Sequence, residues 1–202
     1  MAELGLGYEA LEAINPSLVM VSITPFGQTG PYAHYKATDI VGMAMGGFMY
    51  LTGDSDRPPV RISFPQFYLH GGAAGALGAM LAHTHRALHG EGQHVDISMT
   101  DCVFSLNAMA GAACLAAGDS PGMESTALNG GSFYDYYRTR DGRWMAVGSL
   151  EPQFMQQLCQ VLGCPELVGK GLSPLQSDRE MVKQRLQALF AEQDLAHWQG
   201  QF

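Results

Sequence analysis

Four glycines constrain the fold of this 202-residue chain more than any other sequence feature. They lie at positions 71, 72, 75 and 78, inside an apolar segment that we expect to form a helix from Gln66 to Leu88. Residues three and four positions apart share one face of a helix, so these glycines leave that face almost without side chains. The pattern predicts that another element packs closely against this helix.

A β-branched run from Leu18 to Ile23 predicts a buried strand. Before it, Asn15-Pro16 ends the helix expected over residues 8–14. Residues 24–31 follow this strand directly. Their two glycines and two prolines predict an irregular loop at the carboxyl end of the strand. Open α/β sheets bind ligands at that edge, so the loop is a candidate binding site.

The remaining elements alternate between helix and strand. We expect a helix over residues 38–51, a strand over 94–99, a helix ending near 117, a linker to 131, a hairpin over 133–148 and two final amphipathic helices. The dipeptide Asp141-Gly142 supplies the positive φ angles of the hairpin turn. This order predicts an α/β body over residues 1–120 and a small α+β module over residues 121–202.

Composition argues against several classes of protein. A net charge of −8 argues against a nucleic-acid surface, since phosphate binding relies on clustered Lys and Arg. The absence of a long apolar run and of a signal-peptide pattern leads us to expect a cytoplasmic protein. Four cysteines without Cys-x-x-Cys spacing predict buried free thiols rather than a disulfide framework. The histidines at 83, 85, 89 and 94 lack a neighbouring Cys or carboxylate pair, so we expect no metal site.

Three segments resemble the family III coenzyme A transferases, which include carnitine-CoA and formyl-CoA transferases and α-methylacyl-CoA racemases. They are Ser22–Pro31, Gly90–Ser98 and Tyr137–Gly148, in the family's order, and the segment Glu151–Phe154 resembles the racemase branch. The resemblance implies part of a Rossmann-like α/β large domain, a small α+β domain and interlocked dimers. Family members are roughly twice this length, so it also implies a central segment truncated at both ends.

The resemblance places the family's catalytic positions on unusual residues. Family transferases use an Asp nucleophile to form a mixed anhydride, and that position aligns with Tyr68 or Phe67, neither of which is a carboxylate. The racemase His position aligns with Thr38, whereas the supporting Glu is retained as Glu151. Asp39 aligns with an acidic residue that is common in the family and is a further catalytic candidate.

Further candidates surround these positions. His70 lies one turn from Phe67 and is either a general base or a hydrogen-bonded core histidine. Lys36 and Met99 align with a lysine and a methionine near the cofactor in formyl-CoA transferases, and Arg61 and Arg86 are additional cations. The expected contacts to CoA are Lys36, Met99 and the loop residues Phe26, Gly27, Gln28, Thr29 and Gly30.

Three interpretations remain open. The chain is an active enzyme with rearranged catalytic groups, either a transferase that moves CoA between an acyl-CoA and a carboxylic acid or a racemase-like isomerase. It is a nucleophile-free subunit that needs a catalytic partner chain, in a heterodimer rather than a homodimer. Or it is an inactive fragment that binds CoA. In each case CoA or acyl-CoA is the expected ligand, with no metal, nucleic acid or membrane.

Overall fold

The computed structural model describes the backbone of all 202 residues and every side chain except that of residue 2. The chain forms two compact units. The first unit comprises Met1–Tyr50 and Val60–Asp119, and the second comprises Leu51–Pro59 and Ser120–Phe202. The segment Leu51–Pro59 therefore belongs with residues far from it in the sequence, which the sequence analysis did not anticipate.

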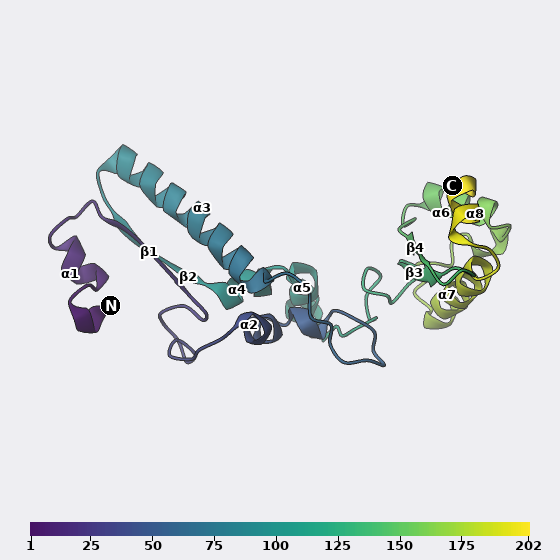
Figure 1. The fold of residues 1–202 in the computed structure, drawn as a ribbon, viewed down its shortest axis with the longest axis horizontal. Coiled ribbons are helices and arrows are strands. Elements are labelled where there is room, and N and C mark those ends of the chain that lie inside the picture. Colours follow the sequence, from purple (N-terminus) through teal and green to yellow (C-terminus); the bar gives the residue numbers. More distant parts are fainter. The chain divides into compact units, whose positions relative to one another are not determined.

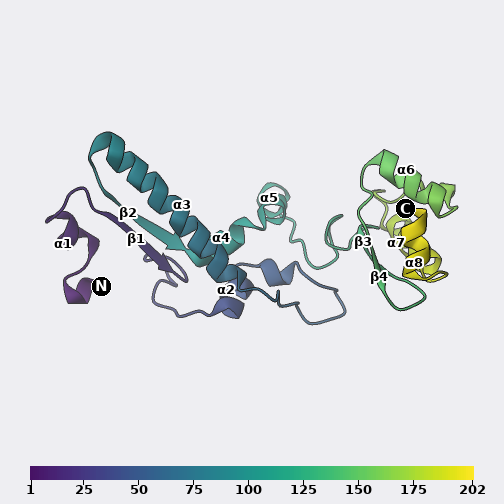
Figure 2. The same cartoon turned by 45° about the horizontal axis from the view of Figure 1, so that its top comes forward.

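A βαβ motif forms the centre of the first unit (Figure 1). Strands β1 (Val19–Thr24) and β2 (Gln93–Ser98) pair in parallel, with Ser22 opposite Asp96. Parallel strands need a crossover connection, and the predicted long helix, observed as α3 (Gln66–His89), provides it. Helix α3 runs along the two strands in both views (Figure 2). The unit also contains α1 (Tyr8–Glu12), α2 (Asp39–Met45), α4 (Met99–Ser105), α5 (Ala108–Ala117) and two short 3-10 helices, Ala2–Leu4 and Phe48–Tyr50.

The close packing predicted for the glycine face of α3 is confirmed at three of the four positions. A methyl group at Gly75 would lie 2.5 Å from Cδ1 of Ile23 on β1, and one at Gly78 would lie 2.7 Å from Cγ1 of Val95 on β2. A methyl group at Gly71 would overlap the Met99 side chain. Gly72 is different, because nothing lies within 4 Å of the corresponding position. Three glycines therefore bring α3 close to the sheet and to Met99.

Two helices of the first unit are shorter than predicted. The helix expected over residues 38–51 ends at Met45, and Gly47 then takes a positive φ of +80°, which glycine adopts without steric cost. The helix expected to continue to residue 117 is divided into α4 and α5 at Asn107, whose buried side-chain amide donates to the Gly46 carbonyl at 2.8 Å. This hydrogen bond therefore connects the end of α2 with the boundary between α4 and α5.

The second unit is built on the predicted hairpin. Strands β3 (Asp135–Arg138) and β4 (Trp144–Val147) are antiparallel, and Gly142 in the turn has a φ of +76°. Three α-helices follow where two were expected: α6 (Pro152–Val161), α7 (Gln176–Phe190) and α8 (Leu195–Gln201), with a 3-10 helix at Pro165–Leu167. Helix α8 packs on the core of this unit through Trp198, whose indole N–H donates to the Phe190 carbonyl at 3.1 Å.

Aromatic rings occupy the middle of this second core. The Phe190 ring stacks on Tyr137 and meets Trp198 edge-on, with ring centroids 5.3 Å apart in both pairs. The four cysteines are free thiols as predicted, but only Cys159 and Cys164 are buried as expected, whereas Cys102 is partly buried and Cys114 is exposed. Burial raises the pKa of the Cys164 thiol to about 12.

No single helix in the described chain combines the length and apolar character needed to cross a membrane. Helices α4 and α5 together satisfy that length and composition test, with a bend of 78° between them.

Candidate functional site

The loop that follows β1 is fixed by a carboxylate on β2. Both strands end at the same edge of the sheet, where Thr24 pairs with Ser98. Gly27 is buried and has a φ of +77°, a conformation that favours glycine. The next residue, Gln28, donates its backbone N–H to Oδ2 of Asp96 at 2.8 Å. Asp96 therefore sets the direction in which the loop leaves the sheet.

Further contacts hold both ends of this bend. The backbone N–H and the hydroxyl of Thr100, in the first turn of α4, both donate to the Pro25 carbonyl, at 3.0 and 2.7 Å. The side-chain nitrogen of Gln28 lies 3.0 Å from Nε2 of His94, and the Ser22 hydroxyl lies 2.9 Å from the same nitrogen. Thr29 and Gly30 are exposed, so the tip of the loop faces solvent while its base is held.

The sequence analysis missed the role of His94 and Asp96. Both lie on the face of β2 opposite to Val95, which contacts α3, and the polar-apolar alternation of this strand is the signal that could have revealed them. The ring of Tyr8 stacks on His94 with centroids 5.1 Å apart. Within the described side chains, no group of three or more His, Cys, Asp or Glu residues is arranged to hold a metal ion.

The first turn of α3 contains a second group of candidate site residues. Phe67 is fully buried, and its ring fills the space where a side chain at residue 42 would be. Its backbone N–H donates to Oδ1 of Asp39 at 3.1 Å. A helix leaves its first N–H groups without partners inside the helix, and a carboxylate that accepts one of them is stabilised there. Asp39 thus has a structural contact that explains an acidic residue at this position.

Of the two residues aligned with the family nucleophile, Tyr68 is accessible and Phe67 is not. Tyr68 is 47% exposed, whereas Phe67 has no exposed surface. Met99 lies in the same core as Phe67 and is buried at 7% exposure. Phe67 thus connects two candidates in this unit, since its backbone N–H donates to Asp39 and its side chain lies in the same core as Met99.

The other candidates have different surroundings. Nε2 of His70 lies 3.1 Å from Oε1 of Gln66, one turn earlier on α3. Lys36 is exposed and, within the described part of the chain, has no hydrogen-bond or ion-pair partner. Glu151 belongs to the second unit, where its backbone carbonyl accepts N–H groups at the start of α6 and its side chain is exposed. Its side chain is therefore open to a ligand.

Comparison with known proteins identifies similar chains. The model of the family described as CoA-transferase family III matches residues 1–202. Succinyl-CoA–D-citramalate CoA-transferase of Chloroflexus aurantiacus is 35% identical over 83% of this chain and 42% of its own length. Acetyl-CoA:oxalate CoA-transferase of Acetobacter aceti is 33% identical over 98% of this chain and 52% of its own length.

Solved structures give the same result. A CaiB/BaiF family protein from Brucella suis superimposes with a TM-score of 0.74 and is 33% identical, over 95% of this chain and 50% of its own length. The chain spans about half the length of the relatives that it matches.

Proposed function

Since the chain belongs to CoA-transferase family III, whose substrates are CoA thioesters, we propose that it takes part in moving CoA between an acyl-CoA and a small carboxylic acid. Residues 1–120 correspond in this proposal to part of the large domain and residues 121–202 to part of the small one. The observation that carries the proposal is the loop at the carboxyl edge of β1, whose base is fixed by Asp96 and whose tip is exposed.

The loop has the chemistry of a phosphate site. The N–H groups of Thr29 and Gly30 lie at its exposed tip, and Lys36 follows with an ammonium group that has no partner among the described side chains. Backbone amides and a cation together suit the phosphates of CoA, because hydrogen bonds to a charged group are stronger than those between neutral groups. In this proposal Phe26, Gly27 and Gln28 shape the loop, and Met99 supports it from the core.

Covalent transfer needs a carboxylate that this region does not supply. No Asp or Glu occurs between Arg61 and Arg86, and Tyr68 occupies the accessible position at the start of α3. A phenol cannot form the acyl anhydride on which the family's transfer depends. We therefore favour a subunit that binds CoA and works with a second chain, in a heterodimer, that carries the nucleophile.

A racemase-like isomerase is the second candidate. It is favoured by Glu151, which is retained where the racemase branch has its supporting glutamate and whose side chain is exposed. Asp39 and His70 are the remaining acid-base candidates. Each has a hydrogen-bond partner within the protein, Phe67 N–H and the Gln66 side chain respectively.

Calorimetric titration of the 202-residue chain with CoA tests the proposed binding. We expect saturable binding, and we expect Lys36→Ala to weaken it about tenfold, because a charge-assisted contact contributes about 1.5 kcal/mol or more. Lys170→Ala, in the second unit, is the matched control and should leave the affinity unchanged. Equal affinity of Lys36→Ala and the unaltered chain would remove Lys36 from the site, and no binding of CoA at all would contradict the proposed function.

A further inference from the structure

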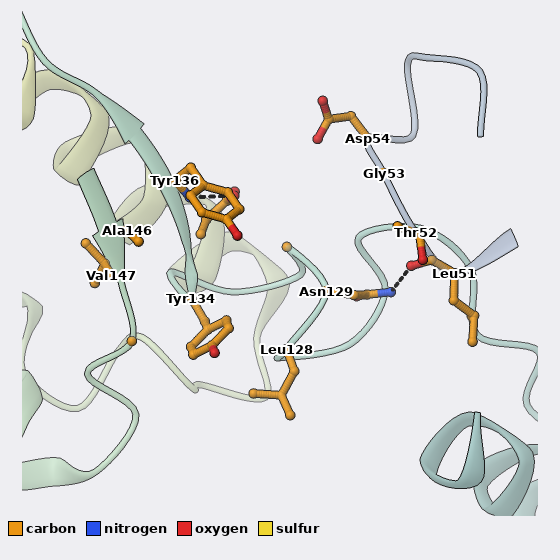
Figure 3. A pocket seen from close by; sticks show the side chains of 13 residues that line it. Leu51, Thr52, Gly53, Asp54, Leu128, Asn129, Tyr134, Tyr136, Ala146 and Val147 are labelled. Atoms are coloured by element: carbon orange, nitrogen blue, oxygen red, sulfur yellow. Dashed lines mark hydrogen bonds between the residues drawn. The ribbon is translucent and has the colours of Figure 1, made fainter. Parts of the chain in front are cut away.

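A cavity of about 400 Å³ lies within the second unit, between the segment Leu51–Asp54 and the β3–β4 hairpin (Figure 3). Tyr134 and Tyr136 lie on the hairpin side of this cavity, and Thr52 and Asp54 lie on the opposite side. Leu128 adds an apolar side chain to the wall. The cavity therefore combines two aromatic rings, several aliphatic side chains and two carboxylates.

The charge of the cavity wall has one sign. Among its thirteen lining residues there is no Lys, Arg or His, but there are two aspartates, Asp54 and Asp135. Asp135 is already paired, since its Oδ2 lies 2.6 Å from Nζ of Lys183. Asp54 pairs with Arg57 at 3.4 Å, but both side chains are more than half exposed, and ion pairs of that kind are weak in water. Asp54 is therefore able to exchange this partner for a ligand.

A neighbouring cavity of about 570 Å³ extends the same surface. It shares Asp54, Asp135 and Tyr136 with the first cavity and adds Trp144. Its four carboxylates outnumber its two cations, Arg57 and Lys183; the carboxylates are Asp54, Asp56, Glu124 and Asp135. The potential over both cavities thus disfavours an anionic ligand such as a phosphate or a carboxylate.

Two of the three aromatic side chains of this surface, Tyr136 and Trp144, lie outside the core of the unit. Tyr136 is 68% exposed and Trp144 is 62% exposed, and they lie at diagonal positions on the solvent face of the hairpin. The core of the unit instead uses Tyr137, on the other face of β3. Exposed apolar side chains are usual when they are scattered singly, whereas two at adjoining cavities indicate a binding surface.

We propose that these cavities form a binding site for a small organic cation, with a quaternary ammonium group as the best-fitting chemistry. The faces of Tyr134 and Tyr136 attract a cation, Trp144 extends the aromatic surface, and Asp54 neutralises the charge. Leu128 contacts the aliphatic part of the ligand. The proposed cation site does not rest on the proposed function.

The test uses choline and its neutral isostere 3,3-dimethylbutan-1-ol, which have the same shape and differ in charge. Titration of each into the 202-residue chain, followed by the proton resonances of the ligand methyl groups, gives the two dissociation constants. We expect choline to bind at least about tenfold more tightly, the ratio for a cation–π and carboxylate contribution of roughly 1.4 kcal/mol. Equal affinities, or no binding of choline, would overturn the proposal.

Variants locate the site. Tyr136→Leu should weaken choline binding about tenfold, whereas Tyr136→Phe keeps the aromatic face and should stay within about threefold. Asp54→Asn should weaken binding and reduce its dependence on salt. Tyr50→Leu removes a similarly exposed tyrosine from the first unit and is the control. Unchanged affinity in both Tyr136→Leu and Asp54→Asn, with unchanged melting temperatures, would show that choline binds elsewhere and would contradict this site.

Discussion

At the scale of single residues, Asp96 links two segments that are far apart in the sequence but adjacent in the fold. Its carboxylate accepts the N–H of Gln28, which lies 68 positions away, directly after the positive φ of Gly27. A charged acceptor makes this hydrogen bond stronger than a neutral one. The segments 22–31 and 90–98 therefore act as one structural unit, in which β2 holds the loop that follows β1.

The first prediction concerns this carboxylate. Asp96→Ala leaves the Gln28 N–H without its partner, so the loop loses its fixed path, and we expect CoA to bind about tenfold more weakly. Asp96→Asn retains an acceptor oxygen and should have a smaller effect. Calorimetry measures both affinities, with Asp119→Ala, an exposed aspartate of the same unit, as the control. If Asp96→Ala binds CoA as the unaltered chain does, the loop is not the CoA site.

The second prediction separates the two residues aligned with the family nucleophile. Phe67→Asp places a carboxylate in a fully buried position and should destabilise the fold by roughly 3 kcal/mol or more, whereas Tyr68→Asp adds it at a half-exposed position and should be tolerated. Urea unfolding measures both. Similar losses of stability in the two variants would contradict the placement of Tyr68 as the accessible residue.

Trapping experiments extend that prediction to the chemistry. With an acyl-CoA and hydroxylamine, intact mass spectrometry should find no hydroxamate on the unaltered chain, because Tyr68 is not a carboxylate and Asp39 is held by the Phe67 N–H. A hydroxamate at Asp39 or Glu151 would show that these residues replace the missing nucleophile. Its formation in Tyr68→Asp would identify position 68 as the family's catalytic position.

At the scale of elements, the carboxylate of Glu124 helps to join the segment Leu51–Pro59 to the rest of the second unit. The hydroxyl and the backbone N–H of Ser55 donate to Oε2 of Glu124, at 2.6 and 3.1 Å. Nζ of Lys183 on α7 lies 3.3 Å from Oε1 of the same residue. Glu124 has a φ of +52°, which is uncommon for a residue with a side chain. These contacts hold Glu124 in that conformation and the segment against its unit.

The third prediction follows from the pKa of Glu124. The hydrogen bonds from Ser55, and secondarily the charge of Lys183, lower the pKa of this carboxyl below its ordinary value of 4.5. A lowered pKa stabilises the folded state above the unfolded-state pKa, and this contribution is lost as the pH falls through the folded-state pKa. Ser55→Ala should therefore reduce the free energy of unfolding by about 1 kcal/mol at neutral pH.

The same difference should become smaller in acid, as the pH falls through the folded-state pKa of Glu124. Urea unfolding at neutral pH and at an acid pH below the folded-state pKa of Glu124 measures it. Glu3→Gln, at an exposed position of the first unit, should show no effect at either pH. A loss of stability in Ser55→Ala that is equal at both pH values would show that the carboxylate charge does not contribute.

At the scale of the whole molecule, large apolar side chains remain exposed on the first unit. They form a stripe along the side of α3, and α5 has no buried residue at all. Besides Tyr68, the large apolar residues exposed on α3 are Leu69, Leu77, Met80, Leu81 and Leu88. Contiguous apolar surface of this kind indicates an interaction site or a tendency to aggregate.

The fourth prediction is that the 202-residue chain self-associates as its concentration rises. Light scattering coupled to size-exclusion chromatography measures the mass, and the double variant Leu77→Lys/Leu81→Lys should shift it towards the monomer. Leu172→Lys, which changes an exposed leucine of the second unit, should leave the association unchanged. A single monomeric species at every concentration would show that this surface is tolerated in water.

The sequence by itself determined the elements whose signals are local. The long helix begins at Gln66 as predicted, both parallel strands lie within one residue of their expected bounds, and the hairpin turns at Asp141-Gly142. Periodicity, β-branched runs and glycine turns act over a few residues, so one segment carries each signal. The three motif segments likewise indicated the family that the comparisons show.

Only the tertiary structure decided which distant polar groups meet. The contacts of Asp96 with Gln28, of Asp39 with Phe67 and of Glu124 with Ser55 join residues at least 28 positions apart. Each depends on strand register or helix packing that no single segment specifies. Likewise, α2 ends at Met45, and the Gly46 carbonyl that follows accepts a hydrogen bond from the side chain of Asn107, which lies 61 positions later. A buried polar group must find a hydrogen-bond partner, and the fold determines which partner is within reach.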